Sequence, residues 1–144
     1  MKKIMVVNGV NLNMLGIRER NIYGDSTYDG LCEYIREKCA DLAVELNFFQ
    51  SNCEGAIVDC LQKCYFDGYD GIVINPGAYT HYSYALYDAI KSISPLPVVE
   101  VHISDIHTRE EFRRVSVTAP ACVAQISGKG FDGYVQAIKT LVEV

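Results

Sequence analysis

Short aliphatic runs alternate along this chain with longer segments in which apolar residues recur every three or four positions. The short runs are bounded mostly by Gly, Pro or Asn, which is typical of buried parallel strands. They predict strands at 4–7, 48–51, 71–74, 98–101 and 121–127. The helical spacing predicts helices at 26–46, 56–67, about 83–92 and 133–142, and a short charged helix at 109–114. Ser26, followed three residues later by Asp29, indicates a capping box at the first helix.

The regular alternation of strands and helices indicates a parallel sheet with helices on both faces. We therefore expect the α/β class: a flavodoxin-like, doubly wound, five-stranded parallel sheet in the order 2-1-3-4-5. The length of 144 residues is close to the common domain size, so we expect a single catalytic domain over 1–144.

Composition removes several classes of function. A net charge of −5 without a basic stripe argues against a nucleic-acid partner. No apolar stretch approaches the ~20 residues that span a bilayer, so no membrane partner is expected. The start, Met1-Lys2-Lys3, leads directly into a strand and carries no cleavage site. We therefore expect a cytoplasmic protein.

The six cysteines do not form a familiar metal motif. There is no Cys-x-x-Cys, and Cys60 and Cys64 are one helical turn apart. Buried thiols on helices behave as small apolar residues, and a cytosolic chain keeps them reduced. A zinc site built from Cys53, Cys60 and Cys64 is the disfavoured alternative, and we expect no metal.

Polar residues follow three of the predicted strands directly. Asn8–Asn13 follows the first strand, Asn75–His81 the third, and His102–His107 the fourth. Ligands of open α/β sheets bind outside the carboxyl ends of the strands. The three segments therefore predict one polar pocket. Gly77 would let the backbone approach a ligand there, although a plain connecting turn also explains it.

Glu100, His102 and Ser104 alternate along one strand, so their side chains point to the same side. A carboxylate beside an imidazole is how a catalytic histidine is oriented and held partly protonated. The alternative is a structural histidine whose hydrogen bonds are satisfied at the end of a strand.

The loop at about 16–24 is a second candidate. Glycines bracket a charged segment that ends in Tyr23, as suits a hinged lid. Tyrosine has an ordinary pKa near ~10, so a tyrosine base needs a nearby cation, and Arg18 is the obvious one. Taken on the residues alone, a solvated surface loop with an ion pair is the favoured alternative.

Arg109 and Arg113 are four residues apart and share a face of the predicted short helix. One of them could hold an anionic or polyhydroxylated substrate. The alternative is that both only form surface ion pairs with Glu110 and Glu111.

Six motifs together resemble one family over nearly the whole chain. They are Asn8–Asn13, Leu15–Glu19 with Tyr23-Gly24, Gln50–Asn52 with Glu54-Gly55, Asn75–His81, Glu100–Ser104 with His107, and Arg109–Arg113. The set resembles the type II 3-dehydroquinate dehydratases. The resemblance implies a hydro-lyase of the shikimate pathway (aromatic amino acid biosynthesis) or of quinate catabolism. It also implies anti elimination of water from 3-dehydroquinate through an enolate, giving 3-dehydroshikimate without a cofactor, in a homo-oligomer of trimers that assemble to a dodecamer.

The resemblance also implies roles for individual residues. Tyr23 would be the base, Arg18 would lower the pKa of Tyr23, and Asn11 would hold a water at the enolate oxygen. His102, oriented by Glu100, would protonate the departing hydroxyl. The implied binding groups are Asn75, His81 and Arg113 for ring hydroxyls, the backbone N–H groups of Ile103 and Ser104 for the carboxylate, and Asp88 reaching into a neighbouring subunit's site.

Several positions depart from the usual family pattern without touching a principal catalytic residue. They are Val10, Arg20, Cys53, Tyr82, Tyr87 and Asp105. Arg20 adds a cation near Tyr23, and Tyr87 bears on the subunit contact. Two rivals remain at this point: a flavodoxin-like binding or signalling domain, and a catalytically silent oligomeric homologue.

Overall fold

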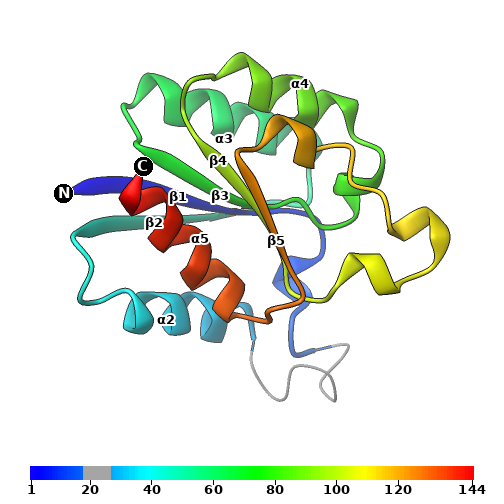
Figure 1. The fold of residues 1–144 in the computed structure, drawn as a ribbon, viewed down its shortest axis with the longest axis horizontal. Helices are drawn as coiled ribbons and strands as arrows, with labels where there is room; N and C mark the ends of the chain where they lie inside the picture. The colour runs from blue at the N-terminus through cyan, green and yellow to red at the C-terminus, as the bar shows by residue number, and fades with distance from the viewer. Residues whose placement is uncertain (18–26) are drawn as a thin grey trace.

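The computed structural model describes residues 1–17 and 27–144, which form one parallel sheet of five strands (Figure 1). The strands are β1 (Lys2–Asn8), β2 (Val44–Gln50), β3 (Gly71–Asn75), β4 (Val98–His102) and β5 (Ala124–Ser127). Their order is β2-β1-β3-β4-β5, and each strand pairs in parallel with its neighbours. The predicted flavodoxin-like order is therefore confirmed.

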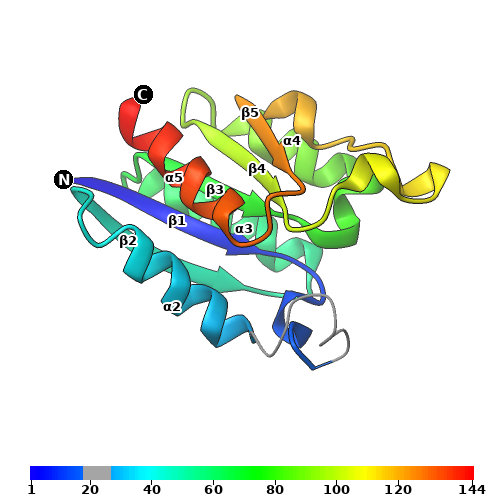
Figure 2. The ribbon, with the colours of Figure 1, turned by 60° about the horizontal axis from the view of Figure 1, so that its bottom comes forward.

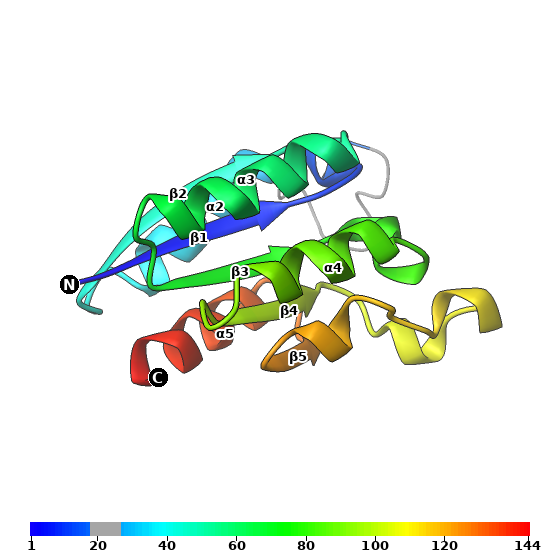
Figure 3. The same ribbon diagram turned by 90° about the horizontal axis from the view of Figure 1, so that it is seen from above.

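Helices cover both faces of the sheet. They are α2 (Tyr28–Lys38), α3 (Glu54–Phe66), α4 (Tyr84–Ser92) and α5 (Asp132–Glu143). Helices α2 and α5 lie on one face, as Figure 2 shows, and α3 and α4 lie on the other, in front of the strands in Figure 3. Short 3-10 turns lie beyond the carboxyl ends of the strands: η1 (Leu12–Met14), η2 (Gly77–His81), η3 (Ile106–Thr108) and η4 (Glu111–Arg113).

Two apolar clusters hold the three layers together, and the alternation of side chains along each strand separates them. In β1, Ile4 and Val6 join the cluster under α2 and α5, whereas Val7 joins the one under α3 and α4. All three side chains are fully buried. Burial of each such side chain stabilises the fold by about 1.5–3 kcal/mol, so the strand pattern determines where the helices dock.

The prediction of a first helix over 26–46 was wrong at its second half. Helix α2 ends at Lys38, and β2 already begins at Val44. Leu42 and Leu46 suit a helical stripe, but the alternating set Val44, Leu46 and Phe48 packs against the α2 and α5 cluster from a strand. Pairing of all seven residues of β2 with β1 outweighs the local helical pattern. At the other end the N-cap is Thr27, and Ser26 lies outside the described residues.

Two further boundaries differ in the segment between β4 and β5. Of the predicted helix 109–114 only the 3-10 turn η4 (Glu111–Arg113) forms, and the turn η3 precedes it at Ile106–Thr108. Residues 121–123 precede β5 rather than belonging to it. Pro120 stands in a 3-10 turn, η5 (Ala119–Ala121), and a proline has no N–H to donate to a strand ladder. The second strand, predicted at 48–51, begins four residues earlier, at Val44. The remaining predicted elements agree with the structure to within two residues at each end.

Two glycines allow the turns after β1 and β3 to touch backbone to backbone. The Gly9 N–H donates to the Asn75 carbonyl at 2.8 Å. A Cβ at Gly9 would lie 2.4 Å from the Pro76 carbonyl oxygen, and one at Gly77 would lie 2.6 Å from that of Val10. Gly77 also has φ +64°, which disfavours residues with a side chain. Gly77 thus allows close contact between the turn after β1 and the turn after β3.

We predict that Gly9→Ala lowers the free energy of unfolding by about 1–3 kcal/mol, because the methyl group would overlap the Pro76 carbonyl. Gly55→Ala is the matched control, since a Cβ there meets nothing within 4 Å and Gly55 lies inside α3. Alanine there should be neutral or stabilising. Thermal unfolding at equal protein concentration measures both, and equal melting temperatures for Gly9→Ala and wild type would contradict the prediction.

Candidate active site

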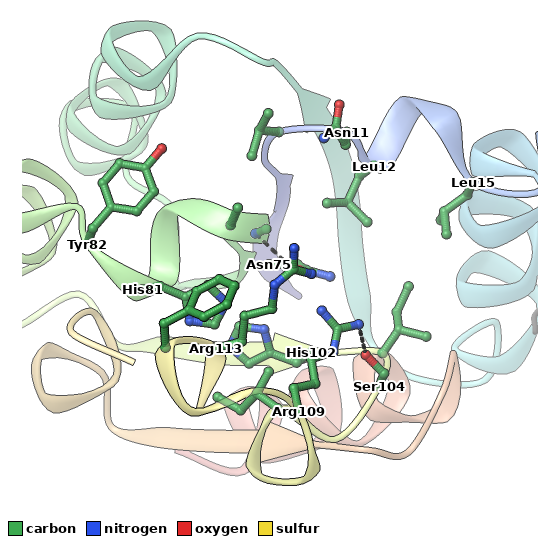
Figure 4. Close-up of a pocket in the computed structure, with 16 residues that line it drawn as sticks. Asn11, Leu12, Leu15, Asn75, His81, Tyr82, His102, Ser104, Arg109 and Arg113 are labelled. Atoms are coloured by element: carbon green, nitrogen blue, oxygen red, sulfur yellow. Dashed lines mark hydrogen bonds between the residues drawn. The ribbon is translucent and has the colours of Figure 1, made fainter. Parts of the chain in front are cut away.

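A pocket of about 530 Å³ lies at the carboxyl ends of β1, β3 and β4. Figure 4 shows that side chains from these separate segments converge on it. The residues that line it are Val10, Asn11, Leu12, Leu15, Asn75, Gly77, Ala78, His81, Tyr82, His102, Ile103, Ser104, Ile106, Arg109, Phe112 and Arg113. The three polar segments expected to meet in one pocket do so.

Glu100 and His102 form a buried pair at the end of β4. His102 Nε2 lies 2.8 Å from Glu100 Oε2, and the two side chains are 6% and 0% exposed. Because the carboxylate can only accept, Nε2 carries the proton of this hydrogen bond. The other ring nitrogen, Nδ1, is then the one that can exchange a proton with a ligand. The period of two in the sequence correctly predicted this pair.

The Glu100 carboxylate has donors on every side. Ser116 Oγ and Gln125 Nε2 each lie 2.8 Å from Oε2, and Thr118 donates to Oε1. Burial by itself raises the pKa of Glu100, but the hydrogen bond and charge of His102, with the hydrogen bonds from Thr118 and Gln125, outweigh it. The pKa is therefore held below its ordinary value of 4.5. Glu100 stays ionised and can stabilise a positive charge on His102.

The segment 115–118 connects this pair to His81. The Val115 carbonyl accepts from His81 Nδ1 at 2.8 Å, so the Nε2 of a neutral His81 ring is an acceptor. The Val117 N–H donates to the Thr80 carbonyl at 2.7 Å, and the Thr80 hydroxyl lies 2.8 Å from that of Thr118. This segment, which we call the strap, thus binds both Thr80 of η2 and the Glu100 carboxylate beside His102.

Backbone and side-chain amides hold the two asparagines of the pocket. Asn11 has φ 69°, a left-handed conformation, and its N–H donates to Asn52 Oδ1 at 3.0 Å. Asn75 Oδ1 accepts from the Gly77 N–H at 3.1 Å, and Asn75 Nδ2 donates to the Tyr134 hydroxyl at 2.9 Å. Both lie on the pocket wall as predicted.

Arg109 and Arg113 both line the pocket, but not as two residues on one helix face. Arg109 follows η3 and donates to the Ser104 hydroxyl, whereas Arg113 ends η4 and has Nε 3.3 Å from Glu110. That ion pair is about half exposed, so it contributes little. No acidic side chain is among the described residues of the lining. Two guanidinium groups and no carboxylate make the pocket suited to an anionic ligand.

The other predicted residues divide into three groups. Ile103 and Ser104 line the pocket. Asp88 is exposed on α4 and does not line the pocket of its own chain. Arg18 and Tyr23, with most of the loop 16–24, lie outside the described residues.

Sequence reasoning missed the apolar part of the wall. Leu12, Leu15, Ile106 and Phe112 contribute it. Leu12, Ile106 and Phe112 each stand between two polar residues, and Leu15 lies between Met14 and Gly16, so no periodicity marks them. Tyr134, which holds Asn75 from behind, was missed for a different reason: on α5 it occupies a buried position. The only available signal was that a fully buried tyrosine hydroxyl usually needs a partner.

The described residues contain neither a cluster of potential metal ligands nor a membrane-spanning helix. All six cysteines are free, and no group of three or more potential ligand side chains is close enough within 1–17 and 27–144 to hold a metal ion. In the same ranges no helix is both long and apolar enough to span a membrane.

A doubly wound sheet with a cationic pocket at its strand ends and a buried histidine–carboxylate pair defines a small α/β enzyme. The family model for dehydroquinase class II matches residues 2–142. The 3-dehydroquinate dehydratase of Clostridium beijerinckii is 60% identical over 139 residues, covering 96% of this chain and 94% of its own. That of Caldicellulosiruptor bescii is 56% identical over 144 residues, covering 100% and 99%.

A solved structure gives the same result. The crystal structure of type II dehydroquinase from Butyrivibrio crossotus matches with a TM-score of 0.93 and 56% identity, over 97% of each chain. The protein belongs to the class II dehydroquinase family.

Because the folded-state pKa of Glu100 lies below its ordinary value, its ionised form stabilises the fold above pH about 4.5, and this contribution is lost as the pH falls through the lowered pKa. We predict that Glu100→Gln is less stable at neutral pH by about 3 kcal/mol, since it breaks a buried pair. Its stability should also decline less steeply than that of wild type between about pH 5 and pH 3.

Unfolding curves at several pH values measure this slope. Glu110→Gln is the control, because it removes the same charge from a side chain that is 65% exposed. Parallel pH dependences for wild type and Glu100→Gln would show that the carboxylate does not contribute in this way.

Proposed function

We propose that this protein is a type II 3-dehydroquinate dehydratase, a hydro-lyase that removes water from 3-dehydroquinate by anti elimination and forms 3-dehydroshikimate. One observation carries the mechanism: a nearly buried His102 lies 2.8 Å from the fully buried Glu100 carboxylate at the wall of a cationic pocket. Family membership and relatives named for this activity support the same reaction. The proposed chemistry needs neither a metal nor an organic cofactor.

The reaction sets three tasks. A proton next to the ketone must leave, the enolate that forms must be stabilised, and the departing hydroxide must be protonated. His102 suits the third task, because the Glu100 carboxylate accepts from Nε2 and so fixes the ring, which leaves Nδ1 for the departing hydroxyl. The proton would pass from Nδ1 to the hydroxyl as the carbon–oxygen bond breaks. Asn11, on the pocket wall at the end of β1, would hold a water against the enolate oxygen.

The pocket also suits the substrate's own groups. Its carboxylate would bind at the backbone of Ile103 and Ser104, beside the Arg109 guanidinium that Ser104 holds. Asn75, His81 and Arg113 would bind the ring hydroxyls. The remaining Nδ2 hydrogen of Asn75 can donate, the free His81 Nε2 can accept, and Arg113 supplies further donors.

Two catalytic roles rest on the family resemblance. Tyr23 would remove the proton and Arg18 would lower its pKa, as parts of a lid at about 16–24. The described chain enters this loop from Leu15, which lines the pocket. The family match over 2–142 supports one catalytic domain across the chain.

Assembly, place and pathway complete the proposal. We infer trimers that assemble to a dodecamer, with Asp88 reaching a neighbouring subunit's site, because Asp88 is exposed on α4 and absent from the pocket of its own chain. Six free thiols favour a reducing, cytoplasmic location. The reaction would serve the shikimate pathway or quinate catabolism.

Purified protein mixed with 3-dehydroquinate should develop the ultraviolet absorbance of the conjugated product. His102→Asn and Tyr23→Phe should each lower kcat by about 10²–10⁴-fold, because each removes one proton-transfer group. His107→Asn is the control, since its exposed side chain does not line the pocket. No product from concentrated wild-type protein would refute the assignment, and a full rate for Tyr23→Phe would refute only the proposed base.

Subunit mixing tests Asp88. Asp88→Ala should lower kcat/KM by about tenfold or more, as expected for a lost hydrogen bond to a charged group. Hybrid oligomers of Asp88→Ala and His102→Asn chains should regain activity at about a quarter of their sites, where an intact His102 meets a neighbour's intact Asp88. Sedimentation gives the assembly size. Hybrids with no more activity than the two unmixed variants would show that Asp88 does not act across subunits.

A further inference from the structure

Asn8 and Asn75 are the last residues of β1 and β3 and are paired in the sheet register. Alternation along each strand turns both side chains toward α5. The Tyr134 hydroxyl of α5 lies between them, 2.7 Å from Asn8 Oδ1 and 2.9 Å from Asn75 Nδ2. The exposed fractions of Asn8, Asn75 and Tyr134 are 0%, 4% and 0%. This polar bridge therefore lies behind the pocket wall, beneath Asn75.

The hydrogen bonds of this bridge run in one direction. The Gly77 N–H can only donate, so it requires the oxygen of the Asn75 amide at 3.1 Å. The Asn75 nitrogen then donates to Tyr134, and the single hydroxyl proton of Tyr134 donates to Asn8 Oδ1. One hydrogen of Asn75 Nδ2 remains without an acceptor in the described part of the chain. Asn75 lines the pocket, so this hydrogen is available to a ligand.

The same chain of hydrogen bonds leaves the Asn8 amide nitrogen poorly paired. Asn8 Nδ2 is a buried side-chain nitrogen that forms no hydrogen bond of ordinary geometry within residues 1–17 and 27–144, although the Asn8 amide is close enough to the Tyr28 hydroxyl to offset part of the rise that burial causes in the pKa of Tyr28. Unpaired buried donors destabilise a fold, so packing alone does not favour an asparagine at this place. The Asn8 oxygen, by contrast, accepts the Tyr134 hydroxyl proton, so that the Tyr134 oxygen is left to accept from Asn75 Nδ2. The arrangement maintains the amide orientation of Asn75 at the expense of Asn8.

We propose that Tyr134, anchored by Asn8, is a positioning residue that holds the Asn75 amide with its nitrogen toward the substrate. The inference rests on the proposed function, in which Asn75 donates to a ring hydroxyl, and extends it to two residues outside the pocket lining. Without the Tyr134 hydroxyl, the Asn75 amide keeps only the Gly77 N–H as a partner, so its nitrogen is held less strictly toward the substrate. Substrate then binds to the fraction of molecules whose amide is correctly placed.

Tyr134→Phe keeps the ring and removes only the hydroxyl. We expect KM for 3-dehydroquinate to rise about threefold to tenfold while kcat stays within about twofold, because the lost contact acts equally in the ground and transition states. Asn75→Ala should raise KM at least as much. In the Asn75→Ala background, Tyr134→Phe should change KM no further, since its effect passes through Asn75.

Tyr34→Phe is the matched control. It removes a tyrosine hydroxyl that donates to Asp132 of α5 at the surface, so KM should not change. Asn8→Leu removes the acceptor for the Tyr134 proton and should raise KM in the same direction. It tests the proposal independently if Tyr134→Phe does not fold, and melting temperatures of all variants separate folding from binding.

The outcomes are distinct. An inactive wild-type protein would overturn the proposed function together with this inference. With active wild type, three results would overturn the inference alone: a Tyr134→Phe variant of lower melting temperature but unchanged KM, an equal KM increase with and without Asn75, or an unchanged KM in every foldable variant. A KM increase confined to backgrounds that contain Asn75 would support it.

Discussion

The buried charge of Glu100 is the constraint around which the second half of the chain is arranged. An ionised carboxylate that is fully removed from water requires donors on every side. Its donors come from different places: His102 from the same strand, Gln125 from β5, and Ser116 and Thr118 from the strap. Each hydrogen bond therefore fixes a different segment relative to β4. The His102–Glu100 pair and the local fold depend on one another through this single charge.

The strap also holds His81, which lies on the pocket wall. Through Thr80 and Val115, segment 115–118 holds η2 and the His81 ring. The imidazoles of His81 and His102 are thus positioned relative to one another by hydrogen bonds that run through the strap and Glu100. This explains why a long irregular connection between β4 and β5 is retained: it supplies the donors for Glu100 and carries Arg109 and Arg113 to the pocket rim.

A second polar network lies on the other face of the sheet, where Tyr134 connects Asn8 and Asn75. Gly9 and Gly77 bring the ends of β1 and β3 close enough for their turns to share backbone contacts. The pocket lies where the two networks meet, so each wall is held from behind by buried hydrogen bonds. Such support is what keeps a site organised before its ligand arrives.

Much of this was accessible from the sequence because it depends on short-range periodicity. Period two placed Glu100 and His102 on one side of a strand, and the alternation of strands and helices predicted the sheet order. The pattern failed where two periods fit the same residues. Leu42 and Leu46 suit a helix as well as a strand, and only pairing with β1 selects the strand. Arg109 and Arg113 both line the pocket, but the shared helix face predicted for them does not exist.

Most of the elements, the strand order and the chemical groups that meet at the strand ends could be predicted from the amino-acid sequence, because they follow from local spacing and from the rules of parallel sheets. Tertiary structure decided what lies behind those groups. Ser116, Thr118 and Gln125 lie 16 to 25 positions from Glu100, and Tyr134 lies 59 and 126 positions from the two amides that its hydroxyl binds. No local period relates such residues, so only the packing of α5 and the strap onto the sheet could bring them together.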